Sequence, residues 1–442
     1  MSLAKMNAMN GRPCGCGREH RFDSRVVTGD GVLAQLPEEI LRLGGTRAFV
    51  LSDKNTFQAA GSTVEALLRG TGIPCAVFSF PEEQPEPDER SVGAAVMHMD
   101  AACDIIVAVG SGVVNDIGKI LSALSRRPYI IVATAPSMDG YASATSSMNR
   151  SGLKISLPSR CADTIIGDSQ ILCQAPMKLL RSGIGDMLAK YISVCEWRIA
   201  NLLLGEYYCE EVAALIREAV DQCVSHAEGL LNRDKDAVMA VFEGLIIGGV
   251  AMNYAGISRP ASGVEHYISH VLDMRAVEFG TQAELHGIQC AMGTYIAANL
   301  YEKLKNLTPD RQKALDNAAA FDLEAWNATL RTMLGKGAES MIALEKKEQK
   351  YDKAAHRVRL EKLLELWPRI LEIMDREIPA VKDLDALYQK LELPRKLEDI
   401  GENGKMLPTV LRCTKDIRDK YVLSRLAWDL GMEKALFGDE TR

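Results

Sequence analysis

The hydrophobic positions of the first 170 residues form short continuous runs, and stretches with apolar residues at helical spacing separate these runs. Four runs have the composition of buried strands: RAFVLS (47–52), PCAVFSF (74–80), CDIIVAVG (103–110) and PYIIVATA (128–135). The helical patterns between them cover 34–43, 58–69, 89–99 and 113–125. Two later segments, LKISLP and DTIIGD, could be further strands. This alternation predicts a parallel, doubly wound sheet with helices on both faces.

The pattern changes after Ala175-Pro176, because proline is well suited to the first position of a helix and helical periodicity dominates from there on. Long amphipathic segments cover 177–200, 206–231, 234–254, 282–305 and 354–375. The sequence therefore predicts two domains: an α/β, Rossmann-like nucleotide domain over 1–175 and an all-α domain over 176–442.

Composition and charge argue against some classes of function, namely nucleic-acid binding and membrane association. The chain has 442 residues, 47% hydrophobic and 25% charged, as in soluble globular proteins. Its formal net charge of −7 does not favour binding to nucleic acid or to an anionic membrane. We expect no membrane-spanning segment and no signal peptide, and we expect the 11 cysteines to be thiols in the cytoplasm.

A glycine turn follows the third predicted strand. Gly110-Ser111-Gly112 separates CDIIVAVG from the helical pattern VVNDIGKIL. Glycines allow close approach to the backbone, and the N-terminus of the following helix offers N–H groups to a pyrophosphate. The turn lacks the full GxGxxG fingerprint, so glycines needed only for packing are an equally good explanation.

Polar side chains follow two other predicted strands. Asp53 comes directly after RAFVLS, where a carboxylate can bond ribose hydroxyls or simply cap the next helix. The segment TAPSMDGYAS (134–143) follows PYIIVA and supplies the hydroxyls of Thr134, Ser137 and Ser143 and the carboxylate of Asp139. The carboxyl ends of strands are where α/β sheets bind ligands, so both places are candidate nucleotide contacts.

A candidate metal site combines Asp186, in SGIGDMLAKY, with His266 and His286. A carboxylate and two imidazoles can hold one divalent transition metal and leave coordination positions open. Three of the seven histidines, including His270, fall within twenty-one residues. Ordinary core or surface histidines remain the alternative.

The N-terminal segment CGCGREH (14–20) also has metal-like spacing. It offers Cys14, Cys16 and His20, whereas a closed structural zinc site needs four ligands. No fourth ligand is evident nearby, and we therefore favour the interpretation without a metal.

Five segments carry a resemblance to a known group of enzymes: VGSGVVNDIGK (109–119), ATAPSMDGYAS (133–143), APMKLLRSGIGDMLAKY (175–191), SRPASGVEHYISH (258–270) and HG (286–287). Over residues 20–300 the chain resembles the superfamily of iron-type alcohol dehydrogenases, glycerol dehydrogenases and dehydroquinate synthases. It is most similar to the bacterial members that act on sn-glycerol 1-phosphate. It departs from much of the superfamily in having Gly-Ser-Gly where three glycines are usual.

The resemblance implies site residues and cofactors. Asp186, His266 and His286 would hold one divalent metal, zinc or nickel, and Asp139 and His270 would contact the substrate. NAD(H) or NADP(H) would lie against a set of residues drawn from three strand ends: Asp53, Gly110, Gly112, Val113, Val114, Asn115, Asp116, Thr134, Ala135, Pro136, Ser137 and Ser143.

The function that the resemblance implies is the interconversion of dihydroxyacetone phosphate and sn-glycerol 1-phosphate, in an assembly of two or more copies. The phosphate of such a small substrate needs a cation, for which Arg259 is the first candidate and Lys154 the second; a salt bridge is the alternative for each. Three other functions stay open: a polyol dehydrogenase, a lyase like dehydroquinate synthase, and a regulatory relative without activity.

Overall fold

The computed structural model describes residues 2–82, 85–151 and 153–439, and the chain divides into two compact units. The first comprises Met1–Met187 and Ala214–Ile257, and the second comprises Leu188–Ala213 and Ser258–Arg442.

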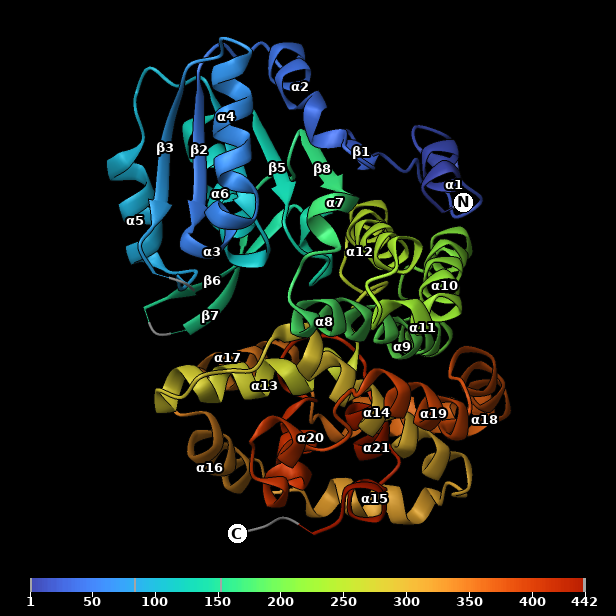
Figure 1. Cartoon of the computed structure of the whole chain (residues 1–442). Helices are drawn as coiled ribbons and strands as arrows, with labels where there is room; N and C mark the ends of the chain where they lie inside the picture. Colours follow the sequence, from blue (N-terminus) through green and yellow to red (C-terminus); the bar gives the residue numbers. More distant parts are fainter. Residues whose placement is uncertain (1, 83–84, 152, 440–442) are drawn as a thin grey trace. The chain divides into compact units, whose positions relative to one another are not determined.

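A six-stranded parallel sheet forms the centre of the first unit (Figure 1), in the order β1-β8-β5-β4-β2-β3. The strands are β1 (Arg25–Gly29), β2 (Ala48–Asp53), β3 (Cys75–Phe80), β4 (Ile105–Gly110), β5 (Tyr129–Ala133) and β8 (Thr164–Asp168). All six residues of β4 are buried, because β4 has a strand on each side and helices over both faces.

Helices cover the sheet on both faces, as the alternation of runs predicts. On one face Val107 and Val109 of β4 pack with buried side chains of α2 (Leu36–Arg42) and α4 (Ser62–Gly70). α6 (Gly112–Ser125) packs on β4 and β5 through residues outside that cluster, among them Val114 and Ile117. The remaining short elements before β5 are α1 (Ser2–Met9), η1 (Val32–Gln35), α3 (Lys54–Thr56), η2 (Phe57–Gly61) and α5 (Glu89–His98).

The segment after β5 leaves the sheet before returning to it. It forms η3 (Asp139–Ala142) and an antiparallel hairpin of β6 (Thr145–Arg150) and β7 (Leu153–Pro158), and then β8 enters the sheet beside β5. The two ambiguous segments of the sequence are thus β7 and β8. β1 was not predicted; it is a short strand at the edge of the sheet, and its register pairs Gly29 with Asp168.

Helices follow the sheet in the first unit. They are α7 (Ser169–Leu172), α8 (Met177–Leu188), α10 (Glu210–Ser225), α11 (Ala227–Leu230) and α12 (Lys235–Ala255). α12 is the one described helix long and apolar enough to cross a membrane, and 78% of its most apolar window is buried inside the protein. That burial is typical of the core helix of a folded domain.

The second unit is helical throughout its described residues. Its elements are α9 (Lys190–Leu204), α13 (Val264–Phe279), α14 (His286–Lys305), α15 (Arg311–Ala320), α16 (Leu323–Leu334), α17 (Gly337–Glu348), α18 (Lys353–Glu377), α19 (Val381–Leu391), η4 (Leu397–Ile400), η5 (Gly404–Met406), α20 (Leu407–Cys413), α21 (Leu423–Asp429) and α22 (Glu433–Phe437). The fold class of a Rossmann-like α/β part followed by an all-α part is therefore confirmed.

The secondary structure changes near residue 175, where the sequence places the boundary between its two domains, 1–175 and 176–442. The compact units are divided differently, because α12 packs against η3 and α7 of the first unit. The first unit therefore includes α12, although this helix lies far beyond residue 175 in the sequence.

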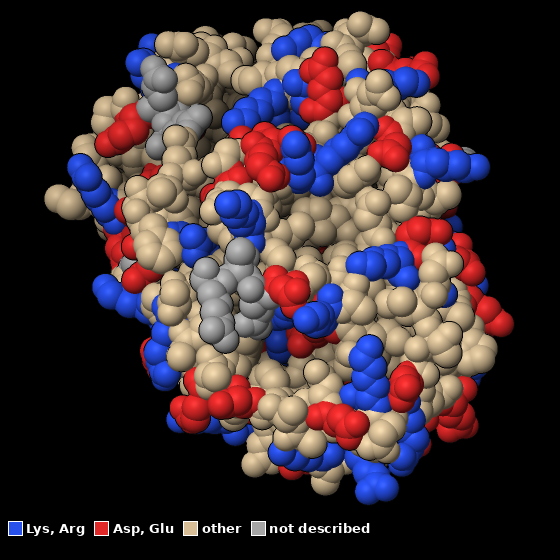
Figure 2. All heavy atoms as spheres, turned by 90° about the horizontal axis from the view of Figure 1, so that it is seen from below, with Lys and Arg blue, Asp and Glu red and all other residues tan. Residues whose placement is uncertain are grey.

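Charged side chains of both signs are interspersed over the face that Figure 2 shows. No broad area of one sign stands out on that face. This distribution agrees with the net charge of −7, which does not favour a nucleic-acid partner.

Candidate functional site

The strand order of the sheet reverses at β2 and β4. The chain runs from β2 outward to β3 and then returns to β4 on the other side of β2. Open α/β sheets bind ligands outside the carboxyl ends of the strands at such a reversal. Asp53 and Gly110, the last residues of β2 and β4, stand at this position.

The two glycines of the turn after β4 have different roles. A Cβ on Gly110 would lie 2.5 Å from Cβ of Val114, so packing under the turn requires glycine there. A Cβ on Gly112 would meet only the side chain of Met138, at 3.6 Å. The packing of the protein itself therefore leaves room at Gly112. Ser111 precedes α6 without capping it by a side-chain hydrogen bond, which leaves the first N–H groups of α6 to another partner.

Asn115 and Asp116, in the first turns of α6, hold the fold together. The Asn115 amide donates to the carbonyl of Gly140 (3.1 Å), and the Tyr129 hydroxyl donates to Oδ1 of Asn115 (2.9 Å). Asp116 pairs with the fully buried Lys119 at 2.7 Å. Both predicted nucleotide contacts thus have structural partners.

Lys119 connects α6 to the loop after β5. Its ammonium group donates to the carbonyls of Gly140 (3.1 Å) and Thr145 (2.6 Å) as well as pairing with Asp116. Burial raises the pKa of the Asp116 carboxyl, and the positive charges of Lys119 and then Lys154 oppose that effect. The hairpin residue Lys154 therefore places its charge close enough to influence the start of α6.

The loop from Thr134 to Ser143 lies against small residues of α8. A Cβ on Gly183 of α8 would lie 1.9 Å from the carbonyl oxygen of Pro136, so only glycine fits there. The hydroxyl of Ser182 donates to the carbonyl of Ser137 (2.8 Å). The Tyr141 hydroxyl donates to the carbonyl of Ala135 (2.7 Å), which closes the loop on itself.

The ends of this loop are also fixed. The Thr134 amide donates to the carbonyl of Gly110 (3.1 Å), which joins the ends of β5 and β4. The hydroxyls of Ser143 and Thr145 lie 3.0 Å apart. The predicted nucleotide segments 110–116 and 134–143 therefore lie next to each other at the carboxyl ends of β4 and β5.

Asp139 and Asp186 are joined through the main chain. The backbone N–H of Asp139 donates to Oδ2 of Asp186 at 2.9 Å, and the Asp186 side chain is fully buried. This hydrogen bond fixes the orientation of the Asp186 carboxylate while its other oxygen remains a candidate metal ligand.

Asp53 caps the short helix α3. Its carboxylate accepts from the Thr56 amide at 2.7 Å, and the Thr56 hydroxyl accepts from the Asp53 amide at 2.9 Å. The capping alternative from the sequence is thus what the structure shows. Burial raises the pKa of this carboxyl, and the hydrogen bonds from Thr56 oppose that effect. The cap uses Oδ1, so a role for Oδ2 at a ribose stays a prediction.

Histidines gather in the second unit, where α13 and α14 pack side by side. The rings of His266 and His286 have centroids 5.0 Å apart. His266, His286 and Cys290 each offer a ligand atom, and these atoms lie within 4.8 Å of one another. Cys290 follows His286 by one helical turn, and its Sγ lies 3.6 Å from Nε2 of that ring.

Neighbouring polar groups orient both histidines. Nδ1 of His266 lies 2.8 Å from Oε1 of the fully buried Glu265, which leaves Nε2 as the atom able to bind a metal. Nδ1 of His286 lies 3.2 Å from the hydroxyl of Ser269, whose proton goes to Oε1 of Gln289 at 2.7 Å. Because that hydroxyl already donates to Gln289, it accepts from Nδ1, and Nε2 of His286 faces Cys290.

A second buried acid lies behind Glu265. Glu196 accepts from the amides of Val264 (2.9 Å) and Leu423 (2.8 Å) and from the hydroxyl of Tyr301 (3.0 Å). Burial, and then the negative charge of Glu265, raise the pKa of Glu196 to about 8. Burial and Glu265 therefore favour the protonated form of Glu196, and the hydrogen bonds from Leu423 and Tyr301 oppose that effect.

His270 lies beside this cluster on α13. Its ring stacks against His286 with centroids 6.3 Å apart, and it follows His266 by one helical turn. The helical spacing of the two histidines is as the sequence predicts.

Arg259 is engaged within the second unit. Its Nε and Nη2 donate to the two carboxylate oxygens of Glu206 (2.8 and 2.6 Å), and Nη1 donates to the carbonyl of Tyr421 (2.9 Å). The arginine is 3% exposed, and its guanidinium is committed to this partly buried ion pair and to the Tyr421 carbonyl. The structure therefore shows the salt bridge that was the alternative to a phosphate anchor.

Sequence reasoning missed Cys290 and Glu265. A signal for each was present, because Cys290 follows His286 by four residues and Glu265 precedes His266 directly. What the sequence could not supply was the direction in which each side chain points.

Comparison with known proteins places these features in context. A family model described as iron-containing alcohol dehydrogenase matches residues 27–176. A protein of Bacillus licheniformis named glycerol-1-phosphate dehydrogenase, with NAD(P)+ as its coenzyme, is 32% identical over 66% of this chain and 74% of its own length. The protein of the same name from Methanothrix thermoacetophila is 36% identical over 63% of this chain and 77% of its own length.

Solved structures show the same fold at lower identity. A probable glycerol dehydrogenase from Sinorhizobium meliloti superposes with a TM-score of 0.60 at 17% identity, over 95% of this chain and 99% of that one. The glycerol dehydrogenase of Schizosaccharomyces pombe gives a TM-score of 0.60 at 16% identity, over 95% and 91%. These two likenesses bear on the fold alone.

Proposed function

Because this chain belongs to the glycerol-1-phosphate dehydrogenases of the iron-containing alcohol dehydrogenase family, we propose that it interconverts dihydroxyacetone phosphate and sn-glycerol 1-phosphate with NAD(H) or NADP(H). The observation that carries the proposal is the pair of the buried His266 and the half-buried His286, with Nδ1 of His266 held by Glu265. A histidine whose Nδ1 is fixed by a carboxylate is arranged as metal ligands are.

The proposed metal ligands are Asp186, His266 and His286. The donor set suits a divalent ion such as zinc or nickel, since it offers one carboxylate oxygen and two imidazole nitrogens. The sulfur of Cys290, close to His286, would favour a thiophilic ion among these. When bound, the ion supplies Lewis acidity at the oxygen that changes between carbonyl and alcohol, and the nicotinamide supplies or accepts the hydride.

The remaining roles fall to side chains of the chain itself. His270 would pass the alcohol proton to and from solvent, since an imidazole titrates near neutral pH. Asp139 would accept a hydrogen bond from a substrate hydroxyl, while its main-chain N–H keeps Asp186 in orientation. Glu265 and Ser269 would hold the two histidine rings in place.

The coenzyme would lie along the segments 110–116 and 134–143. Gly112 and the first N–H groups of α6 would receive the pyrophosphate, because the packing leaves room at this glycine. Asp53 would receive a ribose hydroxyl through Oδ2, which would disfavour a 2′-phosphate and hence NADP(H).

The substrate phosphate needs a cation, and Arg259 carries no such role in this proposal because Glu206 occupies its guanidinium. Lys154 is the remaining candidate from the sequence, and its charge acts on Asp116 at the start of α6. We expect Lys154→Met to raise KM for dihydroxyacetone phosphate by about tenfold, as for a lost charged hydrogen bond. Arg259→Ala should leave this KM unchanged and lower the melting temperature.

The decisive experiment is the reduction of dihydroxyacetone phosphate with NADH and with NADPH, followed by separation of the enantiomers of the product. The proposal requires sn-glycerol 1-phosphate as the product and a far lower rate of glycerol oxidation. A faster reaction with glycerol would make the protein a polyol dehydrogenase. Turnover without net oxidation of NADH would point to a lyase.

A further inference from the structure

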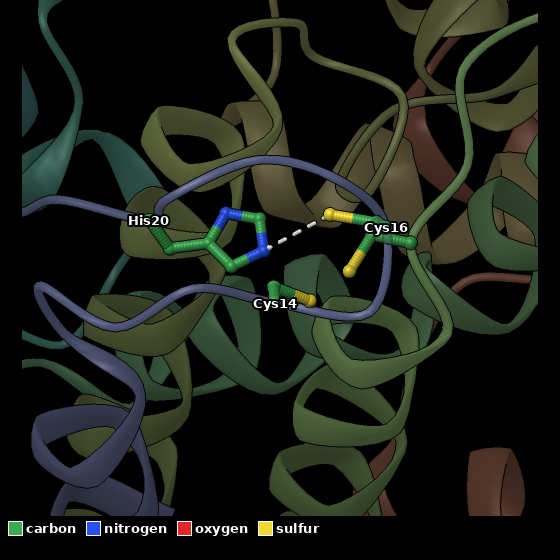
Figure 3. A group of neighbouring side chains, drawn as sticks. Cys14, Cys16 and His20 are labelled. Carbon is green, nitrogen blue, oxygen red and sulfur yellow. Dashed lines mark hydrogen bonds between the residues drawn. The ribbon is translucent and has the colours of Figure 1, made fainter.

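A second cluster of metal-binding side chains lies at the start of the first unit, in a segment that the proposed reaction does not use. Cys14, Cys16 and His20 each offer a ligand atom, and these atoms lie within 4.8 Å of one another. Figure 3 shows the three side chains turned toward one another within one loop. Sγ of Cys16 lies 3.6 Å from Nε2 of His20.

That distance has a physical meaning. Zinc binds thiolate sulfur at about 2.3 Å and imidazole nitrogen at about 2.0–2.1 Å with tetrahedral angles, so a sulfur and a nitrogen on one zinc lie about 3.6 Å apart. The separation of Cys16 and His20 equals this value. The two side chains therefore have the spacing of ligands to a common tetrahedral ion.

The protonation of His20 also suits a ligand. Its Nδ1 lies 3.0 Å from the carbonyl oxygen of Tyr254. A carbonyl only accepts hydrogen bonds, so Nδ1 carries the proton and Nε2 presents its lone pair toward Cys16. Metal-binding histidines characteristically donate their other N–H to a carbonyl or carboxylate. The ring is 1% exposed and stacks on Tyr254 at 5.1 Å between centroids, which fixes its position.

The loop that carries the cysteines is held in shape by its own backbone. The Cys14 amide donates to the carbonyl of Arg18 (2.9 Å), and the Gly17 amide donates to the carbonyl of Cys14 (2.9 Å). Gly17 has φ +83°, a conformation that favours glycine. Arg18 donates to the carbonyl of Ala255 at the end of α12 (2.7 Å). The positions of the thiols therefore do not depend on a mobile chain.

We propose that Cys14, Cys16 and His20 bind a second divalent ion of the zinc class, separate from the catalytic one. Two thiolates and a neutral imidazole form a soft donor set that selects zinc over magnesium or calcium. On binding, the two thiols release their protons to solvent. The ion would fasten the N-terminal segment to the end of α12, where His20 and Arg18 already contact Tyr254 and Ala255.

This proposal reverses the interpretation favoured from the sequence, which set CGCGREH aside because no fourth ligand was evident. The structure adds two observations that the spacing of the residues could not give. The backbone of the loop is held by hydrogen bonds, and the ring of His20 is oriented by the Tyr254 carbonyl. A site with three protein ligands is complete when a thiol from elsewhere in the chain or a water fills the fourth position.

The test is the metal content of the purified full-length protein, measured per chain by mass spectrometry after growth in zinc. We expect about two ions per chain in the wild type and about one in Cys14→Ser/Cys16→Ser and in His20→Ala. The matched control is Cys75→Ser/Cys173→Ser, which removes two half-buried thiols of the same unit and should keep both ions.

Two further measurements keep the result independent of folding and of catalysis. Cobalt-substituted wild type should show a thiolate-to-cobalt absorption band that the single variant Cys16→Ser weakens. His266→Ala/His286→Ala should lose the catalytic ion and keep the N-terminal one, which separates this site from the proposed function. The proposal is overturned if wild type and Cys14→Ser/Cys16→Ser contain the same amount of metal, or if thiol titration of the wild type finds Cys14 and Cys16 joined as a disulfide.

The same cobalt spectra test which group fills the fourth coordination position of the proposed ion. Cys209 is a buried thiol elsewhere in the chain, directly before α10. A weaker band in Cys209→Ser adds this thiol to the ligand set, and an unchanged band assigns the position to solvent. Either result requires the bound ion and supports the site.

Discussion

The two units use their candidate site residues in different ways. In the first unit three polar side chains among the predicted nucleotide contacts have structural partners: Asn115 and Asp116 hold α6 to its surroundings, and Asp53 caps α3. The remaining candidates include the first backbone N–H groups of α6, which the Ser111 side chain does not cap. In the second unit the candidate ligand groups are side chains. Glu265 orients the ring of His266, and Ser269 orients the ring of His286. A motif can therefore mark a candidate binding place while its side chains hold the surrounding backbone in position.

The sharpest test of this contrast removes the side chains of the second unit. We expect His266→Ala/His286→Ala to lower kcat by at least about 10³-fold, because the loss of the ion removes the electrostatic stabilisation of the reaction. The folded state should persist. Steady-state kinetics, metal content and circular dichroism measure the three quantities. If the variant keeps its turnover, His266 and His286 have no role in the reaction.

The next test concerns the structural role of side chains in the first unit. Lys119→Met should lower the free energy of unfolding by about 3–5 kcal/mol, because Asp116 and two carbonyls lose a buried partner. Urea denaturation gives this value. Arg69→Met, which breaks an exposed ion pair with Glu65, is the control and should cost less than about 1 kcal/mol.

A pair of glycine variants separates packing from binding. Gly112→Ala should keep the melting temperature and raise KM for NADH by about tenfold, because its new Cβ finds room in the protein but meets the phosphates. Gly110→Ala should lower the melting temperature instead, because its Cβ meets Val114 at 2.5 Å. An unchanged KM in Gly112→Ala would place the pyrophosphate elsewhere.

The smallest expected effect is a change of pH dependence in the second unit. The pKa of Glu196 is about 8 in the folded protein, above its ordinary value of 4.5, so the folded state binds more protons between these values. Stability should therefore fall as pH rises from about 5 to about 8 and then level off. Glu196→Gln should flatten that profile, measured as melting temperature against pH. A profile identical to wild type would mean that Glu196 is ionised throughout.

More of the fold than of the candidate site could be predicted from the sequence. Four strands and the change to helices near residue 175 could be predicted, since buried parallel strands are continuous apolar runs and later helices are periodic. β1 escaped because five residues at a sheet edge, with mixed burial, give no distinct pattern. The partner of Arg259, Glu206, lies 53 residues away and could not be read from the sequence, whereas the local cap at Asp53 was one of the two interpretations that the sequence offered. The orientation of His20 could not be read either, since Tyr254 lies 234 residues away.

The hydrogen bond between Asp139 and Asp186 has a consequence for redesign. The donor is a main-chain N–H, so the hydrogen bond to the carboxylate of Asp186 does not depend on the side-chain chemistry of a non-proline residue at position 139. In the proposed site Asp139 would contact the substrate through its side chain, so Asp139→Asn or Asp139→Ser should change substrate preference while the main-chain anchor of the proposed metal ligand Asp186 stays in place. Substrate recognition and metal retention would then be separable at this one residue.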